Sequence, residues 1–109
     1  LTDDQWAKTL ELKADDQFQK GKKIAAVETY VTLLDQFENK RPMSSVRYRA
    51  GKILFDEGDV KGAEKLWASL PEKGGEFYKK LAQEKLKQAA FSDSYKKYMD
   101  RIPAAAGMQ

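Results

Sequence analysis

The sequence resembles itself three times over, and this internal repeat limits the fold more than any other feature of the chain. A comparison of the chain with itself, shifted by 37 residues and then by a further 31, aligns five columns without gaps. The columns hold, in order, small residues, large apolar residues, residues at an expected turn, small residues and aromatic residues. Their members are Ala14, Gly51 and Ala82; Phe18, Phe55 and Leu86; Gly21, Gly58 and Ala89; Ala26, Ala63 and Ser94; and Tyr30, Trp67 and Tyr98. Repeats of about 34 residues are typical of stacked helical hairpins, because one hairpin alone leaves an apolar face in water.

Apolar residues recur every three or four positions through most of the chain, a pattern that predicts amphipathic helices. Glycine and proline separate these segments, since glycine ends helices in a left-handed conformation and proline cannot continue them. The expected helices span residues 3–20, 23–38, 44–56, 60–70, 76–90 and 92 to just before Pro103. The expected caps are Asp3 or Asp4, Asp59 and Ser92, and Ser44 or Ser45 is expected to open the third helix. No segment alternates with a period of two for long enough to predict a strand.

The two columns of small residues predict close helix crossings. We expect Ala14 to face Ala26, Gly51 to face Ala63, and Ala82 to face Ser94, because closely packed helices need small side chains where they cross. The predicted fold is all-α: about six helices form a right-handed stack of three antiparallel hairpins in a single domain. The hairpins are expected at about residues 3–39, 43–71 and 75–102, followed by a tail at 103–109.

The composition argues against most enzyme chemistry. The chain has no cysteine, which excludes disulfides and thiolate nucleophiles, and no histidine, the usual proton carrier near neutral pH. Paired carboxylates occur at Asp15-Asp16 and at Asp56 to Asp59, but the second pair is better explained by helix capping than by a metal site. We therefore expect no enzymatic activity, no cofactor and no bound metal.

The charge is unevenly distributed along the chain. The net charge is +3, yet residues 1–41 carry −1 and residues 73–109 carry +4. A nucleic-acid-binding domain of this size usually concentrates more positive charge on one face, so such binding is a weaker alternative, through Lys79, Lys80, Lys87, Lys96 and Lys97. No apolar run approaches the length that a membrane span needs. Because the sequence starts with Leu1 rather than Met, we expect it to be part of a longer protein.

The middle unit resembles a tetratricopeptide repeat. The residues that carry the likeness are Arg49-Ala50-Gly51, Leu54, Gly58-Asp59, Ala63, Trp67 and Leu70-Pro71. The first and third units resemble degenerate copies, so the likeness covers about residues 4–102. Departures from the family pattern are Leu33, Leu70 and Arg101, and Ser94 leaves open whether the third hairpin is a full repeat or an end cap. The stretch from Tyr30 to Gly58 is most similar to bacterial envelope proteins of this family, which implies a periplasmic or envelope location rather than a cytoplasmic one.

This resemblance implies a scaffold that binds a protein or peptide in the groove lined by the first helix of each hairpin. The groove-facing candidates on the polar sides of those helices are Glu11, Asp15, Tyr48, Lys52, Lys79 and Gln83. A groove lined in this way would run from acidic to basic and fix the direction of a bound segment. The alternative is that these residues form ordinary solvated helix faces, or that Arg47 and Arg49 form a cation–π cluster with Tyr48. A second functional alternative is self-association through exposed apolar residues at the two ends, such as Trp6 and Met99.

Overall fold

The structure is a computed structural model that describes residues 2–102, and it is entirely helical within that range. Its five helices are α1 (Asp3–Gln19), α2 (Lys23–Phe37), α3 (Ser44–Asp56), α4 (Val60–Ala68) and α5 (Glu76–Asp100). The prediction of an all-α fold is therefore confirmed for the described residues. Pro103 and the expected tail at 103–109 lie outside them. None of the described helices combines the length and the apolar character needed to cross a membrane.

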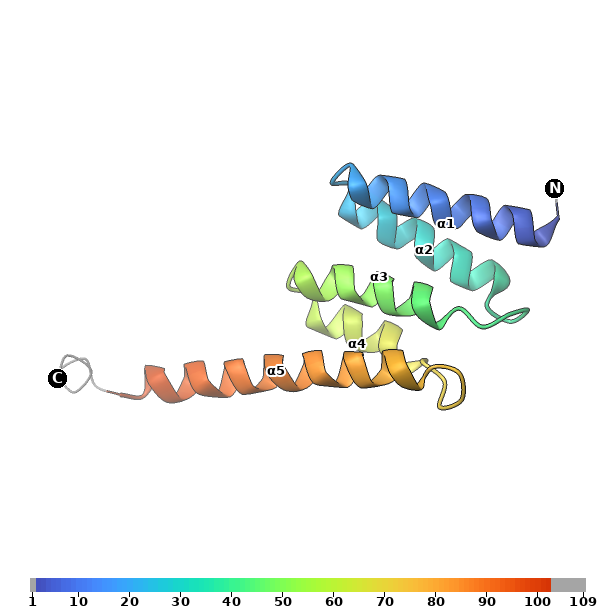
Figure 1. Cartoon of the computed structure of the whole chain (residues 1–109). Helices are drawn as coiled ribbons and strands as arrows, with labels where there is room; N and C mark the ends of the chain where they lie inside the picture. The colour runs from blue at the N-terminus through green and yellow to red at the C-terminus, as the bar shows by residue number, and fades with distance from the viewer. Residues whose placement is uncertain (1, 103–109) are drawn as a thin grey trace.

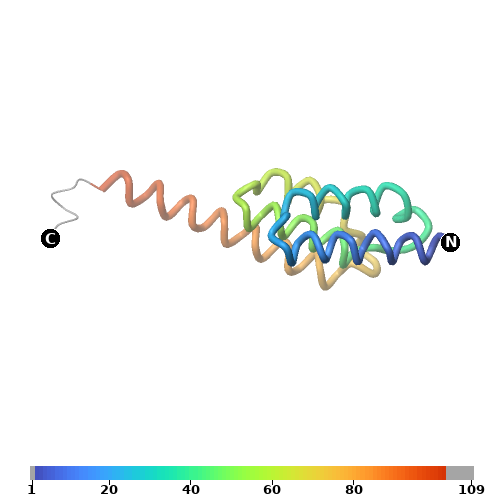
Figure 2. The backbone as a smooth tube through the Cα atoms, turned by 90° about the horizontal axis from the view of Figure 1, so that it is seen from above, coloured from blue at the N-terminus to red at the C-terminus, as the bar shows by residue number. Residues whose placement is uncertain are grey.

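The helices follow one another in space as they do in the chain (Figure 1). The first two form an antiparallel pair, α3 and α4 form a second pair, and α2 packs on α3. The N-terminal half of α5 packs on α3 and α4, while its C-terminal half extends past the ends of the other helices (Figures 1 and 2). The described chain is thus two hairpins followed by one long helix.

The long helix α5 contradicts the prediction of six helices and of a third hairpin. Residues 76–90 and 92–102 were expected to form two helices, but α5 continues for 25 residues to Asp100. No glycine or proline occurs between Gly75 and Pro103, so nothing interrupts the backbone hydrogen bonds of the helix. Ser92 consequently lies inside a helix instead of capping one. The expected crossing of Ala82 with Ser94 does not exist, because both residues belong to the same helix.

The turns of the first two hairpins form as the sequence predicts. Gly21 and Gly58 adopt φ angles of 81° and 94°, in the left-handed region that glycine enters at least cost. Asp59 caps α4 by accepting a hydrogen bond from the backbone N–H of Gly62 at 2.9 Å. The cap of α1 differs from the prediction, because Thr2 and Gln5 form a reciprocal capping box just before the expected aspartates.

Small residues allow close packing in both hairpins. Ala14 of α1 and Ala26 of α2 are completely buried in one core cluster together with Leu33. In the second hairpin, a Cβ atom on Gly51 would lie only 2.2 Å from Nε1 of Trp67. The missing side chain of Gly51 therefore makes room for the indole ring of Trp67, whereas the sequence led us to expect Ala63 opposite it.

The Trp67 indole connects the second hairpin to α5. Its ring stacks on Tyr48 with the ring centroids 5.7 Å apart, and its Nε1 donates a hydrogen bond to the Tyr48 carbonyl oxygen at 3.1 Å. The same cluster of buried residues includes Leu70 and Ala82. This cluster holds the first half of α5 against the body.

Candidate functional site

A hollow of about 150 Å³ lies where α1, α2 and α3 meet. Its lining combines three apolar or aromatic side chains with three charged ones: Phe18, Tyr30 and Ile53, and Arg49, Lys52 and Asp56. Phe18 is 40% exposed, so an apolar group remains accessible next to the charges. An apolar surface with a few fixed charges is the usual composition of a surface that holds a segment of another molecule.

Arg49 ties α3 to α1 at the edge of this hollow. Its guanidinium donates to Oε2 of Glu11 at 3.0 Å and to Oδ1 of Asp15 at 2.9 Å, and its Cζ lies 5.3 Å from the centroid of the Tyr30 ring. The Tyr30 hydroxyl also donates a hydrogen bond to Asp15. Glu11 and Asp15 are therefore brought together as predicted, but Arg49 neutralises part of their charge. The acidic end of the predicted groove is consequently an ion-pair network instead of a free acidic surface.

Burial, together with the hydrogen bond to Asp15, raises the pKa of Tyr30 to about 12. The pKa of a tyrosine in an unfolded chain is about 10, so Tyr30 keeps its proton longer in the folded protein. Stability from this group is complete below about pH 10 and is lost as the pH rises toward 12, because only the unfolded chain releases the proton readily.

We therefore expect Tyr30→Phe to reduce the loss of stability between about pH 10 and pH 12. The measurement is the free energy of unfolding in urea at several alkaline pH values for both proteins. Part of the pH dependence should remain in the variant, because burial also raises the pKa of Tyr48. An unchanged pH dependence in Tyr30→Phe would show that Tyr30 ionises normally in the folded chain.

Tyr48 does not line a groove, which contradicts its prediction as a binding residue. It is 8% exposed, and its ring lies between Trp67 and Tyr78, with centroid distances of 5.7 Å and 5.6 Å. Its neighbour Lys52 does lie at the hollow, where its ammonium forms an ion pair with Asp56 at 2.9 Å. Tyr48 is buried because α5 packs against the side of α3 that carries it, a contact that sequence periodicity within α3 does not reveal.

The last two predicted binding residues, Lys79 and Gln83, lie in a different place. They line a separate hollow of about 250 Å³ between α4 and α5, next to Trp67 and Leu86. Lys79 also forms an ion pair with Glu72 in the preceding loop. The six predicted residues therefore do not form one continuous groove, since Lys52 lines the α1–α3 hollow, Glu11 and Asp15 pair with Arg49 at its edge, and the others lie elsewhere.

The alternative cation–π cluster of Arg47 and Arg49 around Tyr48 does not form. Arg47 makes two hydrogen bonds to the Glu38 carboxylate, at 2.9 Å and 2.6 Å, and one to the carbonyl oxygen of Leu66 at 2.9 Å. Arg49 instead lies over the ring of Tyr30. Both arginines therefore connect helices that are adjacent in space, and the two hairpins are held together partly by these contacts.

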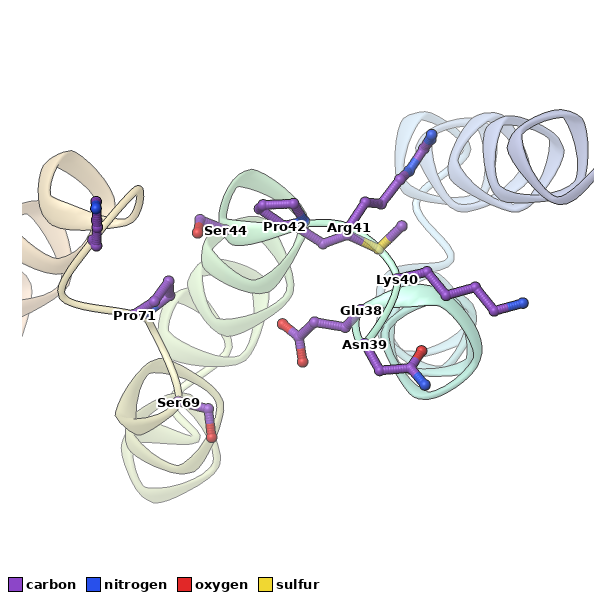
Figure 3. A pocket seen from close by; sticks show the side chains of 10 residues that line it. Glu38, Asn39, Lys40, Arg41, Pro42, Ser44, Ser69 and Pro71 are labelled. Carbon is purple, nitrogen blue, oxygen red and sulfur yellow. The ribbon is translucent and has the colours of Figure 1, made fainter.

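A larger cleft of about 400 Å³ lies between the loop that follows α2 and the loop that follows α4 (Figure 3). Its basic side chains Lys40 and Arg41 extend away from Ser44 (Figure 3) and pair with Asp3 and Asp4 on α1. The Ser44 hydroxyl is buried without a hydrogen-bond partner among the described residues, although Ser44 itself belongs to the lining of the cleft. The cleft thus offers little chemistry for holding a ligand.

The acidic residues at the α3–α4 turn have structural partners. Asp59 caps α4 and Asp56 pairs with Lys52, which agrees with the capping explanation proposed from the sequence. Among residues 2–102, no group of three or more acidic side chains is placed to hold a metal ion.

Sequence reasoning missed Phe18, Tyr30 and Arg49 as residues of the candidate site. Phe18 and Tyr30 were named only as members of the apolar and aromatic columns, and Arg49 was placed in an alternative cation–π cluster with Tyr48. The sequence did contain a signal for the role of Arg49. This cation lies near the middle of its helix, and the preceding hairpin carries acidic residues at the corresponding level.

A scan against protein-family models, a search of curated proteins and a search of solved structures each found no significant match. Function must therefore be argued from the residues and their geometry alone.

Proposed function

We propose that this chain is a non-catalytic interaction scaffold that binds a segment of a partner protein at the α1–α3 hollow. The observation that carries the proposal is the combination, in one hollow, of the accessible Phe18 ring with the charged groups of Arg49, Lys52 and Asp56. An apolar contact supplies affinity, and charges at its edge select a complementary partner. The residues come from the first helix of each hairpin and from α2, as in the groove of a helical repeat protein.

The arrangement of two hairpins and a following helix also supports a tetratricopeptide-like stack as the underlying architecture. In this proposal, α5 stands in the place of the first helix of a third unit, whose second helix the described chain lacks. Arg49 helps to fix the distance between α1 and α3, because Glu11 and Asp15 hold its guanidinium from one side. A surface that is already rigid loses less conformational entropy when it binds.

The test is a selection of peptides that bind the whole chain from a displayed random library, followed by affinity measurements on the variant Lys52→Glu. Lys52 is half exposed, so the exchange reverses a charge at the hollow at little cost to the fold. We expect the affinity of selected peptides to fall about tenfold, the equivalent of about 1.4 kcal/mol. The matched control is Lys65→Glu on the exposed side of α4, which should leave the affinity unchanged.

Two results would contradict this proposal. The first is that no peptide is retained by the protein, and the second is that the retained peptides bind Lys52→Glu as tightly as the parent chain. Self-association is the second candidate, supported by the half-exposed Trp6 and Met99 near the two ends of the described chain. It is distinguished by light scattering, because self-association makes the measured mass rise with protein concentration.

A further inference from the structure

The C-terminal part of α5 extends away from the rest of the described protein (Figures 1 and 2). Every residue from 90 to 100 is exposed, and Figures 1 and 2 show this part of the helix extending beyond the two hairpins. Its helical conformation therefore does not depend on packing against the body. A solvated helix of this kind is normally polar on all sides.

The apolar face of α5 changes sides at the point where the helix leaves the body. Ala82 and Leu86 belong to the cluster that packs on α3 and α4. Continuing along the same side of the helix, at spacings of three and four residues, come Asp93, Lys96 and Asp100. The side that packs on the body is thus polar in the projecting half.

The opposite side shows the reverse change. In the half next to the body it carries the exposed Phe77 in the first turn and then the polar residues Lys80, Glu84 and Lys87, all at the surface. In the projecting half it carries four exposed apolar or aromatic side chains, which we call the aromatic stripe. The stripe consists of Phe91, Tyr95, Tyr98 and Met99, which are 72%, 57%, 63% and 44% exposed. Spacings of four, three and one residues place all of them on one side of the helix.

In the projecting half of α5, basic and acidic side chains lie in different places relative to this stripe. Lys87 lies four residues before Phe91 and Arg101 three residues after Tyr98, so a basic side chain lies at each end of the stripe. Asp93 follows Phe91 by two residues and Asp100 follows Tyr98 by two, and two residues advance about 200° around a helix. The acidic side chains of the projecting half are therefore on the far side, where Asp93 pairs with Lys97 at 3.1 Å.

This arrangement of charges favours one possible partner of the stripe over another. If a second copy lay antiparallel along the stripe, Lys87 of one helix would lie beside Arg101 of the other, and these like charges would repel. A negatively charged lipid surface attracts the flanking cations and leaves the two aspartates facing water. Tyrosine is also a residue that favours the boundary between water and lipid.

We propose that the aromatic stripe of α5 rests on an anionic lipid surface, with the helix parallel to that surface. The α3–α4 hairpin packs on the other side of α5, so it does not obstruct the contact. Because the helix is already formed, binding requires no folding step. The contact is peripheral: the four side chains enter the headgroup region, and no part of the described chain spans the bilayer.

The experiment is flotation of the whole chain with two kinds of vesicle. One kind contains only phosphatidylcholine, and the other contains equal parts of phosphatidylcholine and phosphatidylglycerol. We expect binding to the anionic vesicles alone, weakened by added salt because the cations act through screened charges. The double variant Tyr95→Ser, Tyr98→Ser should bind at least about tenfold more weakly, because it removes half of the apolar contact. Replacing Arg101 by glutamine should weaken binding about fivefold.

The matched control is Leu12→Ser, which removes an equally exposed apolar side chain from α1, far from the stripe, and should not change binding. Circular dichroism on all variants checks that they remain folded, which is expected because the exchanged residues in α5 lie outside the body. Equal binding to both kinds of vesicle, or none to either, would overturn the proposal. So would a dimer that the Tyr95→Ser, Tyr98→Ser variant fails to form, because a second copy would then cover the stripe. The peptide-binding proposal for the α1–α3 hollow stands or falls separately, since Lys52→Glu leaves the stripe unchanged.

Discussion

We expect Trp67→Ala to lower the free energy of unfolding by about 3–5 kcal/mol. Trp67 is 4% exposed, and its ring packs on Tyr48 and Phe55 with centroid distances of 5.7 Å and 5.8 Å. Truncation to alanine leaves a cavity between α3, α4 and α5 and leaves the Tyr48 carbonyl oxygen without the indole hydrogen bond. Since small domains are stable by only about 5–15 kcal/mol, this loss is a large part of the total. Urea unfolding followed by circular dichroism measures it.

The chain supplies its own control for this prediction in Trp6. That side chain is 49% exposed on α1, so Trp6→Ala should cost less than about 1 kcal/mol. The remaining tryptophan in each variant also reports on unfolding by its fluorescence. If the two variants lose the same stability, Trp67 does not connect the second hairpin to α5 as described.

The second large effect is expected for Gly51→Ala, which should lower the free energy of unfolding, an unusual result for this exchange in a helix. In most helices this exchange stabilises a protein, because glycine costs about 0.5–1 kcal/mol relative to alanine. Here the new Cβ would lie 2.2 Å from Nε1 and 2.6 Å from Cε2 of Trp67, so either the indole or α4 must move. We expect a loss of about 2 kcal/mol in the free energy of unfolding.

A double-mutant cycle tests the physical reason for this sign. In a Trp67→Leu background the ring atoms next to Gly51 are gone, so adding Gly51→Ala should cost little or even stabilise the helix. Additive effects of the two exchanges would mean that the glycine is required for another reason than space for the indole.

The first four helices follow from the sequence because their ends are set by local chemistry. Gly21 and Gly58 enter conformations that other residues avoid, and Asp59 caps the helix that follows it. Such signals act over a few residues and do not depend on what packs nearby. The burial of Ala14 and Ala26 was also foreseeable, since small residues at helical spacing recur where helices approach closely.

The candidate site was predictable only in part. Glu11, Asp15 and Lys52 were identified from the polar sides of their helices, and the structure places them at one hollow or its edge. Tyr48 was misassigned because its position on α3 looks solvent-facing until α5 is added. The role of Arg49 was missed because its partners are 38 and 34 residues away in the chain. Contacts of that range depend on how the hairpins pack, not on local spacing.

By itself, the order of residues determined that the chain is helical, where α1 to α4 lie to within about two residues, and which small side chains are buried in the cores. Those properties arise from backbone preferences and periodic apolar residues, which act locally. Only the tertiary structure decided that α5 is one helix. The shift of its apolar face near residue 90 resembles a boundary between two helices, yet a backbone without glycine or proline continues through it. The tertiary structure also decided that the first half of this helix packs against Trp67 while the second half leaves its aromatic stripe exposed. The reason is that α5 extends past the ends of the other helices.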